Sequence, residues 1–235
     1  MKPPVTWITG AHGFIGQRLA RRCADRGHLV CGVGHGTWPP MEAARSGVSH
    51  WINGDVTSSN LHALRAAGGP PATVFHLAGG SSVGAAISQP GEDFARTVGS
   101  TASLLEWLRQ ESPATSLVVA SSAAVYGAGH AGRIAESATL RPGSPYGFHK
   151  LMMEDLCHSY ASSYGIAVVI ARCFSVYGDG LRKQLLWDLC CKLSSAVEVI
   201  ELGGDGAELR DWVDVATRSI SWRRCLVSPA AKGRR

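Results

Sequence analysis

A glycine-spaced turn near the start of the chain constrains its fold more than any other feature. Gly10, Gly13 and Gly16 follow an apolar, β-branched run at residues 5–8 and lead into residues 17–24, whose apolar side chains recur at helical spacing. Gly10 permits a tight turn, Gly13 lets backbone approach a pyrophosphate, and Gly16 lets helix pack on strand. Because the first N–H groups of a helix are free to bind phosphate, this strand–turn–helix pattern predicts a dinucleotide-binding loop.

A tyrosine and a lysine four residues apart form the second informative motif. Tyr146 and Lys150 follow Pro145, which suits the first turn of a helix, so both side chains are expected on one helical face. A tyrosine has a pKa of about 10, too high for a base near neutral pH, and a nearby ammonium lowers that pKa by favouring the phenolate. Ser122 follows an expected strand at residues 117–120 and can hydrogen-bond a reacting oxygen. The spacing therefore predicts a tyrosine base assisted by a lysine.

Together these motifs resemble the short-chain dehydrogenase/reductase superfamily, in particular its extended branch of nucleotide-sugar epimerases and dehydratases. The resemblance implies an α/β fold, a Rossmann-type doubly wound parallel sheet with an incomplete small C-terminal substrate lobe. It divides the chain into an NAD(P)-binding domain at residues 1–175, a partial substrate-binding lobe at 176–215 and an atypical basic tail at 216–235. The catalytic residues that it implies are Tyr146, Lys150 and Ser122.

The same resemblance implies NAD as the cofactor and leaves NADP possible. Gly34 ends the expected second strand, where NAD-type members carry an acidic residue that binds the adenosine ribose. No arginine follows Gly34 directly to clasp a 2′-phosphate, so NAD is favoured narrowly. Thr97 replaces an asparagine that touches the cofactor in the family, so this contact is expected to be shortened or absent. The expected cofactor-binding residues are Gly10, Gly13, Phe14, Ile15, Gly16, Asp55, Val56, Leu77, Ala78, Gly79, Ser121, Tyr146 and Lys150.

A nucleotide-diphosphate sugar is the substrate that the resemblance implies. Arg210 lies in the segment Arg-Asp-Trp-Val and matches an arginine that binds the substrate diphosphate through a charge-assisted fork. Ser175 replaces an asparagine that normally meets the sugar nucleotide. The expected substrate-binding residues are Ser82, Ser122, Tyr146, Ser175 and Arg210.

The expected activity is epimerisation at sugar C4 through a transient 4-ketosugar. Ala123 and Ala124 stand where the 4,6-dehydratases of the family carry an acidic pair. Alanine supplies neither the acid nor the base that dehydration needs, so dehydratase chemistry is disfavoured. Two alternatives stay open: an NAD(P)H-dependent reductase of a 4-keto nucleotide sugar, and a truncated cofactor-binding protein without activity.

Charge and composition limit the other function classes. All acidic residues lie at or before Asp214, so the body of the chain is close to neutral. The formal charge of +5 arises from the last twenty residues, which carry six basic groups, and this distribution argues against a nucleic-acid-binding face. The seven cysteines and nine histidines show no metal-ligand spacing, so no metal is expected.

The remaining expectations concern location, the tail and assembly. The chain has no apolar run of bilayer length and no signal peptide, which predicts a cytoplasmic protein without membrane association. The tail after residue 215 lacks the continuation typical of the family, and two interpretations stay open: a frameshifted or otherwise replaced end, and a natural short variant whose tail packs or pairs with another subunit. Long helices are expected near residues 94–110 and 146–164, and the resemblance implies a homodimer through a bundle of these helices. A strand is expected at residues 198–202.

Overall fold

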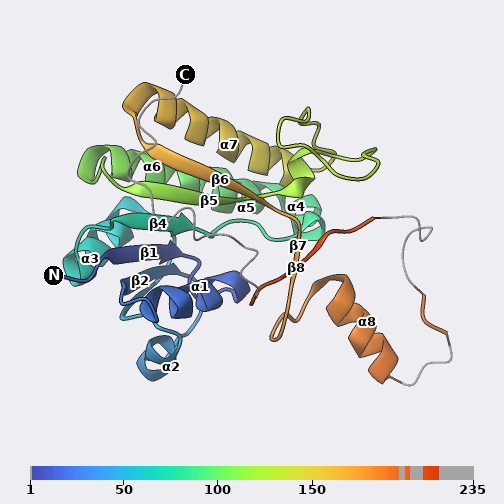
Figure 1. Cartoon of the computed structure of the whole chain (residues 1–235), viewed down its shortest axis with the longest axis horizontal. Helices are drawn as coiled ribbons and strands as arrows, with labels where there is room; N and C mark the ends of the chain where they lie inside the picture. The colour runs from blue at the N-terminus through green and yellow to red at the C-terminus, as the bar shows by residue number, and fades with distance from the viewer. Residues whose placement is uncertain (1, 196–198, 202–208, 217–235) are drawn as a thin grey trace. The chain divides into compact units, whose positions relative to one another are not determined.

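The computed structural model describes residues 2–195, 199–201 and 209–216 (Figure 1). Within these ranges the chain forms two compact units that divide between Cys173 and Phe174, and each unit is described by itself. In neither unit do the described residues form a helix with the length and apolar character that crossing a membrane requires.

The first unit is built on a six-stranded parallel sheet with strand order β3-β2-β1-β4-β5-β6. Its strands are β1 (Val5–Thr9), β2 (Leu29–Gly34), β3 (His50–Asn53), β4 (Thr73–His76), β5 (Ser116–Ser122) and β6 (Ala167–Cys173). The central strand β1 pairs with β2 on one side and β4 on the other, so the winding of the chain reverses there. Ligands of such sheets bind at the carboxyl ends of the strands beside this reversal. The prediction of a doubly wound parallel sheet is confirmed.

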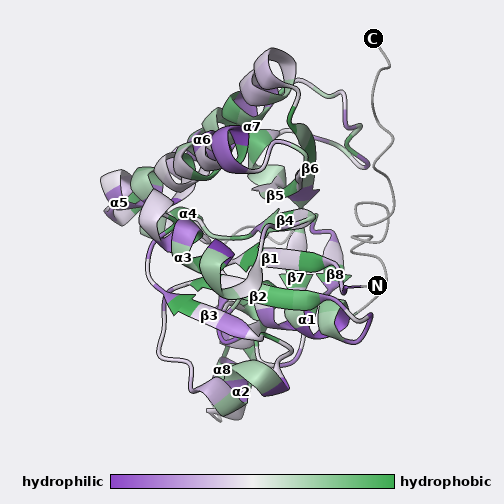
Figure 2. Ribbon diagram, turned by 90° about the vertical axis from the view of Figure 1, so that its left-hand side faces the viewer, coloured by the Kyte–Doolittle hydropathy of each residue, from purple (hydrophilic) through white to green (hydrophobic). Residues whose placement is uncertain are grey.

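Helices cover both faces of this sheet (Figure 2). The helices are α1 (Phe14–Ala24), α2 (Pro40–Arg45), α3 (Ser58–Gly68), α4 (Val83–Ser88), α5 (Pro90–Phe94), α6 (Ser100–Glu111) and α7 (Pro145–Tyr164). Because parallel crossovers are right-handed, the reversal at β1 puts α1 on one face and α3, α6 and α7 on the other. On that second face α6 packs against both α3 and α7.

The main core fills the space between the sheet and α3, α6 and α7. Side chains of the strands and of these helices meet there without access to water, and such burial is the dominant favourable term in folding. Its fully buried members include Trp7, Val74, Leu117 and Val119 from the strands and Leu61, Leu104, Leu108 and Met153 from the helices.

The helix expected near residues 94–110 is divided in the structure. It consists of α5, a π-helical turn at Ala95–Gly99 and α6. Within the wide turn the Thr101 hydroxyl donates to the Thr97 carbonyl at 2.7 Å, and the Ser100 hydroxyl donates to the Arg96 carbonyl at 2.5 Å. Side-chain donors therefore reach carbonyls of this turn, and the bulge is of the kind found at functional sites.

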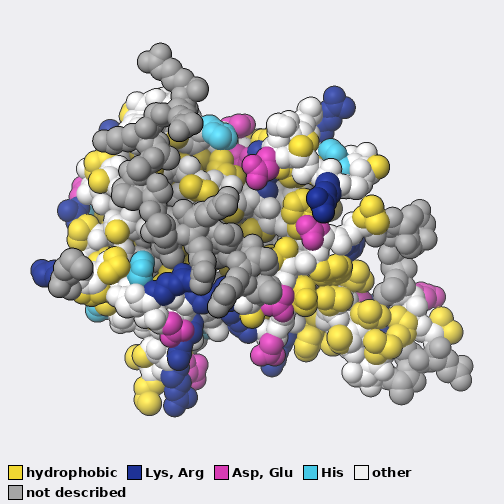
Figure 3. Space-filling view, viewed as in Figure 1, with side chains coloured by type: hydrophobic (Ala, Val, Ile, Leu, Met, Phe, Trp, Pro, Cys, Tyr) yellow, Lys and Arg dark blue, Asp and Glu magenta, His cyan; other side chains and the backbone are white. Residues whose placement is uncertain are grey.

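The second unit contains the two-stranded parallel sheet of β7 (Ser175–Tyr177) and β8 (Trp212–Asp214) and the helix α8 (Gln184–Ser194). No residue of α8 is buried, and Figure 3 shows hydrophobic side chains gathered over this helix. Of the strand expected at residues 198–202, the described residues 199–201 are not part of a strand, so this expectation is wrong for them. Residues 198 and 202, like residues 217–235 of the basic tail, lie outside the described residues.

Candidate active site

The glycine turn connects β1 to α1 at the carboxyl edge of the sheet. Gly10 has a φ of +69°, and a Cβ there would lie 3.0–3.2 Å from backbone atoms of Leu77 and Ala78. A Cβ on Gly16 would overlap the Gly10 carbonyl. Both positions therefore require glycine, one for its backbone conformation and the other for close packing of helix on turn.

The N-terminus of α1 has the features of an anion site. Its N-cap is Gly13, no side chain caps it, and its first turn carries no acidic residue. The adjoining loop after β4 is fixed by the Thr9 hydroxyl, which accepts hydrogen bonds from the N–H groups of Leu77 and Ala78 at 3.2 and 3.1 Å. Small residues on that loop and free N–H groups on the helix together fit the pyrophosphate of a dinucleotide.

The carboxyl end of β2 has no acidic side chain, unlike NAD sites in which a carboxylate at this strand end binds the adenosine ribose. A Cβ on Gly34 would lie 3.2 Å from both the Trp51 ring of the neighbouring strand and the Gly10 Cα, so a side chain at this position would be crowded. His35 Nε2 lies 2.8 Å from an oxygen of Asp55, and both side chains are exposed. Asp55, which the sequence assigns to the cofactor, is thus hydrogen-bonded to His35, while its neighbour Val56 is buried.

Ser122, Tyr146 and Lys150 come together at the end of β5. Ser144 caps α7 by accepting a hydrogen bond from the Gly147 N–H at 3.2 Å, which sets Tyr146 in the first turn. The Lys150 ammonium lies 5.9 Å from the centre of the Tyr146 ring and donates to the Ala120 carbonyl at 3.0 Å. The Tyr146 phenol is hydrogen-bonded to the Ser122 side chain.

Burial governs the charge states of this cluster. It raises the pKa of Tyr146, and the hydrogen bond with Ser122 opposes that rise only in part. It also lowers the pKa of Lys150 to about 8, although Cys173, Asp93 and Glu154 favour the ammonium. Burial therefore raises the pKa of the Tyr146 phenol in the protein alone, and the expected lowering by the Lys150 ammonium together with the positive ring of a bound cofactor stays a prediction.

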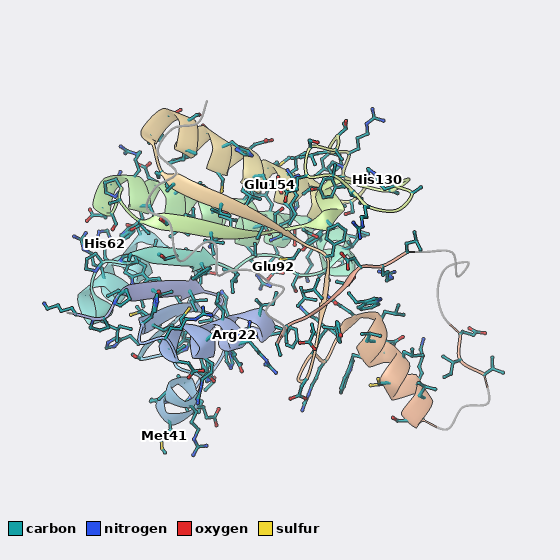
Figure 4. The ribbon with its side chains drawn as sticks, in the orientation of Figure 1. Arg22, Met41, His62, Glu92, His130 and Glu154 are labelled. Atoms are coloured by element: carbon teal, nitrogen blue, oxygen red, sulfur yellow. The ribbon has the colours of Figure 1, made fainter. Side chains whose placement is uncertain are left out.

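A buried acid behind the cluster escaped the sequence analysis. Glu154 of α7 is 1% exposed, and its two oxygens share the single N–H of the Arg172 Nε in a bifurcated hydrogen bond, while one of them accepts a second bond from Nη2 at 2.8 Å. The Ser121 hydroxyl also donates to Glu154, and the Arg172 Nη1 donates to the Tyr126 hydroxyl at 2.9 Å. Figure 4 shows Glu154 between α7 and the strands. Ser121, expected to contact cofactor, thus uses its hydroxyl to tie β5 to α7.

Removing this buried acid is expected to destabilise the protein strongly. Glu154→Ala leaves the Arg172 guanidinium without its partner, which costs about 3–5 kcal/mol of unfolding free energy for a buried pair. Urea denaturation measures the change. Glu92→Gln is the control, because Glu92 forms an exposed pair with Arg96 and should cost less than about 1 kcal/mol. A loss below about 1 kcal/mol for Glu154→Ala would contradict the structural role of this pair.

The other residues expected in the site have separate places. Ser82 caps α4 by accepting a hydrogen bond from the Ala85 N–H at 3.2 Å. Thr97 is fully buried, and its hydroxyl accepts from the Gly80 N–H at 2.8 Å, so it holds the loop after β4. Ser175 begins β7 and Arg210 is exposed just before β8, both in the second unit. Their substrate contacts stay predictions.

Comparison with known proteins identifies the family. Residues 6–216 match the model of the NAD dependent epimerase/dehydratase family. An uncharacterized UDP-glucose epimerase of Bacillus subtilis, YtcB, is 31% identical over 223 residues, which are 89% of this chain and 68% of the relative. The chain thus spans about two thirds of this relative.

Solved structures share the fold. MoeE5 in complex with UDP-glucose and NAD superimposes with a TM-score of 0.79 and 33% identity, covering 97% of this chain and 73% of that one. UDP-glucose 4-epimerase from Brucella ovis in complex with NAD gives a TM-score of 0.78 and 27% identity, with coverage of 90% and 69%. The chain therefore belongs to the NAD-dependent epimerase/dehydratase family.

Proposed function

We propose that this protein is an NAD-dependent epimerase that inverts C4 of a UDP-sugar. The observation that carries the proposal is the cluster of Ser122, Tyr146 and Lys150 at the sheet edge that also bears the glycine turn. Ala123 and Ala124 form the 3₁₀ turn directly after Ser122, and neither can supply the acid–base pair for dehydration. The names of YtcB and of the Brucella protein, and the UDP-glucose bound to MoeE5, support a UDP-sugar as substrate.

The residues of the glycine turn and of the loop after β4 fit the cofactor. Gly10, Gly13 and Gly16 with the N-terminus of α1 would hold its pyrophosphate, and Gly79 leaves room beside the Lys150 ammonium. NAD, when bound, supplies a cationic ring that takes a hydride from the sugar and gives it back, and whose charge favours the phenolate of Tyr146.

The side chains of this protein carry the proton. Tyr146 as phenolate accepts the proton of the C4 hydroxyl and later returns it to the same oxygen. Ser122, which is hydrogen-bonded to Tyr146, donates to that oxygen while charge develops on it. The Lys150 side chain is buried, at 4% exposed, and its pKa is about 8. Below about pH 8 it therefore keeps a positive charge beside Tyr146 and Ser122. Arg210 binds the diphosphate of the substrate.

We further propose a homodimer through α7. Phe148 and Met152 on this helix are exposed, which supports an apolar contact between two copies.

Cofactor balance tests the proposed reaction. Purified protein is incubated separately with UDP-glucose, UDP-glucuronate and dTDP-glucose, and the C4 epimers are separated by chromatography. We expect one of the UDP-sugars to give its C4 epimer without net consumption of NAD(H), because the cofactor is regenerated in each cycle. In a parallel incubation with NADPH and a 4-keto nucleotide sugar, consumption of one equivalent of NADPH for each sugar reduced would assign the reductase activity instead.

A further inference from the structure

One buried imidazole at the carboxyl edge of the sheet has no part in the mechanism above. His76, the last residue of β4, is 1% exposed, and both of its ring nitrogens have close partners. Its Nδ1 lies 2.8 Å from the Thr9 hydroxyl, and its Nε2 lies 3.0 Å from the Thr101 hydroxyl. A neutral imidazole has one N–H donor and one bare acceptor, so the hydrogens of the two hydroxyls determine which nitrogen carries the proton.

The hydroxyls near Nε2 donate their own hydrogens elsewhere. The Thr101 hydroxyl donates to the Thr97 carbonyl at 2.7 Å. The Ser100 hydroxyl, 3.5 Å from Nε2, donates to the Arg96 carbonyl at 2.5 Å. Because a hydroxyl has only one hydrogen, Nε2 meets acceptors alone, and it therefore carries the proton and donates it to the Thr101 oxygen.

The Thr9 hydroxyl determines the state of the other nitrogen. Its oxygen accepts hydrogen bonds from the Ala78 N–H and from the Leu77 N–H, which also contacts the Thr9 carbonyl. With both acceptor positions used, Thr9 donates its hydrogen to a bare Nδ1, and a hydrogen on Nδ1 would compete with the two N–H groups. Burial and the Lys150 ammonium lower the pKa of His76 to about 3, in agreement with a neutral ring.

This chain of hydrogen bonds supports the loop after β4 from both ends. At the first end Thr9 holds the N–H groups described above. At the other end the Gly80 N–H donates to the hydroxyl of Thr97, the residue whose carbonyl terminates the chain, at 2.8 Å. Between the two ends, a Cβ on Gly79 would lie 3.4 Å from the Lys150 nitrogen. The supported loop therefore passes beside the candidate site.

We propose that His76, held as the neutral tautomer with its hydrogen on Nε2, is a positioning residue that keeps the loop of residues 77–80 in the conformation that receives the cofactor. This inference rests on the proposed function, which puts the dinucleotide against that loop. The other tautomer, or a protonated ring, would take the Thr9 oxygen from the loop N–H groups. His76 thus connects β1, the loop and the π-helical turn through one fixed arrangement of hydrogens.

The position of the imidazole hydrogen is the first test. Long-range ¹H–¹⁵N NMR spectra distinguish a protonated ring nitrogen from a bare one, and sequential backbone assignment identifies His76. We expect a hydrogen on Nε2, a bare Nδ1 and no titration between about pH 5 and pH 8. A hydrogen on Nδ1, or titration within that range, would overturn the inference. The measurement uses the unmodified protein without cofactor.

Thr101→Val removes the acceptor of the Nε2 hydrogen and tests whether the chain positions the loop. Thr115→Val is the matched control, because both threonines are buried and each hydroxyl donates to a backbone carbonyl at 2.7 Å. Thr115 directly precedes β5, at the opposite edge of the sheet. In Thr101→Val we expect about tenfold faster amide hydrogen exchange at Ala78 and Gly80 without cofactor, and about tenfold weaker binding of NAD. Thr115→Val should change neither quantity, and Thr101→Ser, which keeps the hydroxyl, should restore both.

The outcomes separate positioning from a general contribution to the fold. Equal changes in the two valine variants, or normal exchange at both amides in Thr101→Val, would overturn the inference. Faster exchange at Ala78 and Gly80 in a protein that binds no NAD would refute the proposed function while supporting the positioning of the loop. If Thr101→Val does not fold, as judged by circular dichroism, the position of the imidazole hydrogen in the unmodified protein decides.

Discussion

Tyr146→Phe is expected to lower kcat by about 10²–10⁴-fold, the range that general acid–base catalysis contributes, while NAD affinity changes little. The substitution removes only the hydroxyl that would carry the C4 proton, and the ring stays in the first turn of α7. Steady-state kinetics on the C4 epimers and calorimetric titration of NAD measure the two quantities.

Another tyrosine on the same helix provides the control for this variant. The Tyr160 hydroxyl is hydrogen-bonded to Glu106 at 3.2 Å, on the outer part of α7 and α6, so Tyr160→Phe should keep kcat near the normal value. Activity of Tyr146→Phe within tenfold of the unmodified protein would remove this residue from the role of base.

Lys150→Met is expected to make the protein less active and more stable at once. Burial lowers the pKa of Lys150 from its usual 10.5 to about 8, so below that pH folding must bury an ammonium. Removing it should lower kcat by about 10²-fold or more, because the phenolate loses its cationic neighbour. It should raise the unfolding free energy at pH 7 by about 1–3 kcal/mol, after the lost bond to Ala120 is allowed for.

The lowered pKa of Lys150 also determines how the unfolding free energy changes with pH. Between about pH 8 and 10.5 the unfolded chain holds the Lys150 proton and the folded chain does not, so the stability of the unmodified protein should rise with pH in that window. Lys150→Met should lack that rise. Urea denaturation at several pH values measures both, with Lys192→Met in an exposed pair with Asp188 as control. A variant less stable than the unmodified protein at pH 7 would contradict the burial of a charged lysine.

Local spacing carried most of what could be predicted. Two motifs lie within a single turn or a single helix: the glycines at 10, 13 and 16, and the Tyr146–Lys150 pair. Their relative positions therefore follow from short segments of sequence. The doubly wound parallel sheet was implied by the family that these motifs resemble, and both the fold and the family are confirmed. The roles of the individual site residues stay predictions.

Contacts between distant segments could not be read from spacing. Glu154 meets Arg172 across α7 and β6, and Trp51 from β3 fills the space beside Gly34 on β2, so neither follows from a local motif. The burial that raises the pKa of Tyr146 in the protein alone could not be read from spacing either, because it depends on the whole unit. His149 stood inside the Tyr–Lys motif, but its hydrogen bond with Asp93, 56 residues earlier, could not be read from that motif.

In the proposed reaction the sugar is oxidised and reduced again at C4 by one bound cofactor while Tyr146 carries the proton. UDP-glucose with deuterium at C4, or the UDP-sugar that proves active, is converted in ordinary water and the epimer is analysed by mass spectrometry and NMR. We expect the epimer to keep the deuterium at C4 and to take up no hydrogen from solvent at carbon. Loss of the deuterium to solvent would contradict it, because inversion would then proceed by removing a proton from carbon.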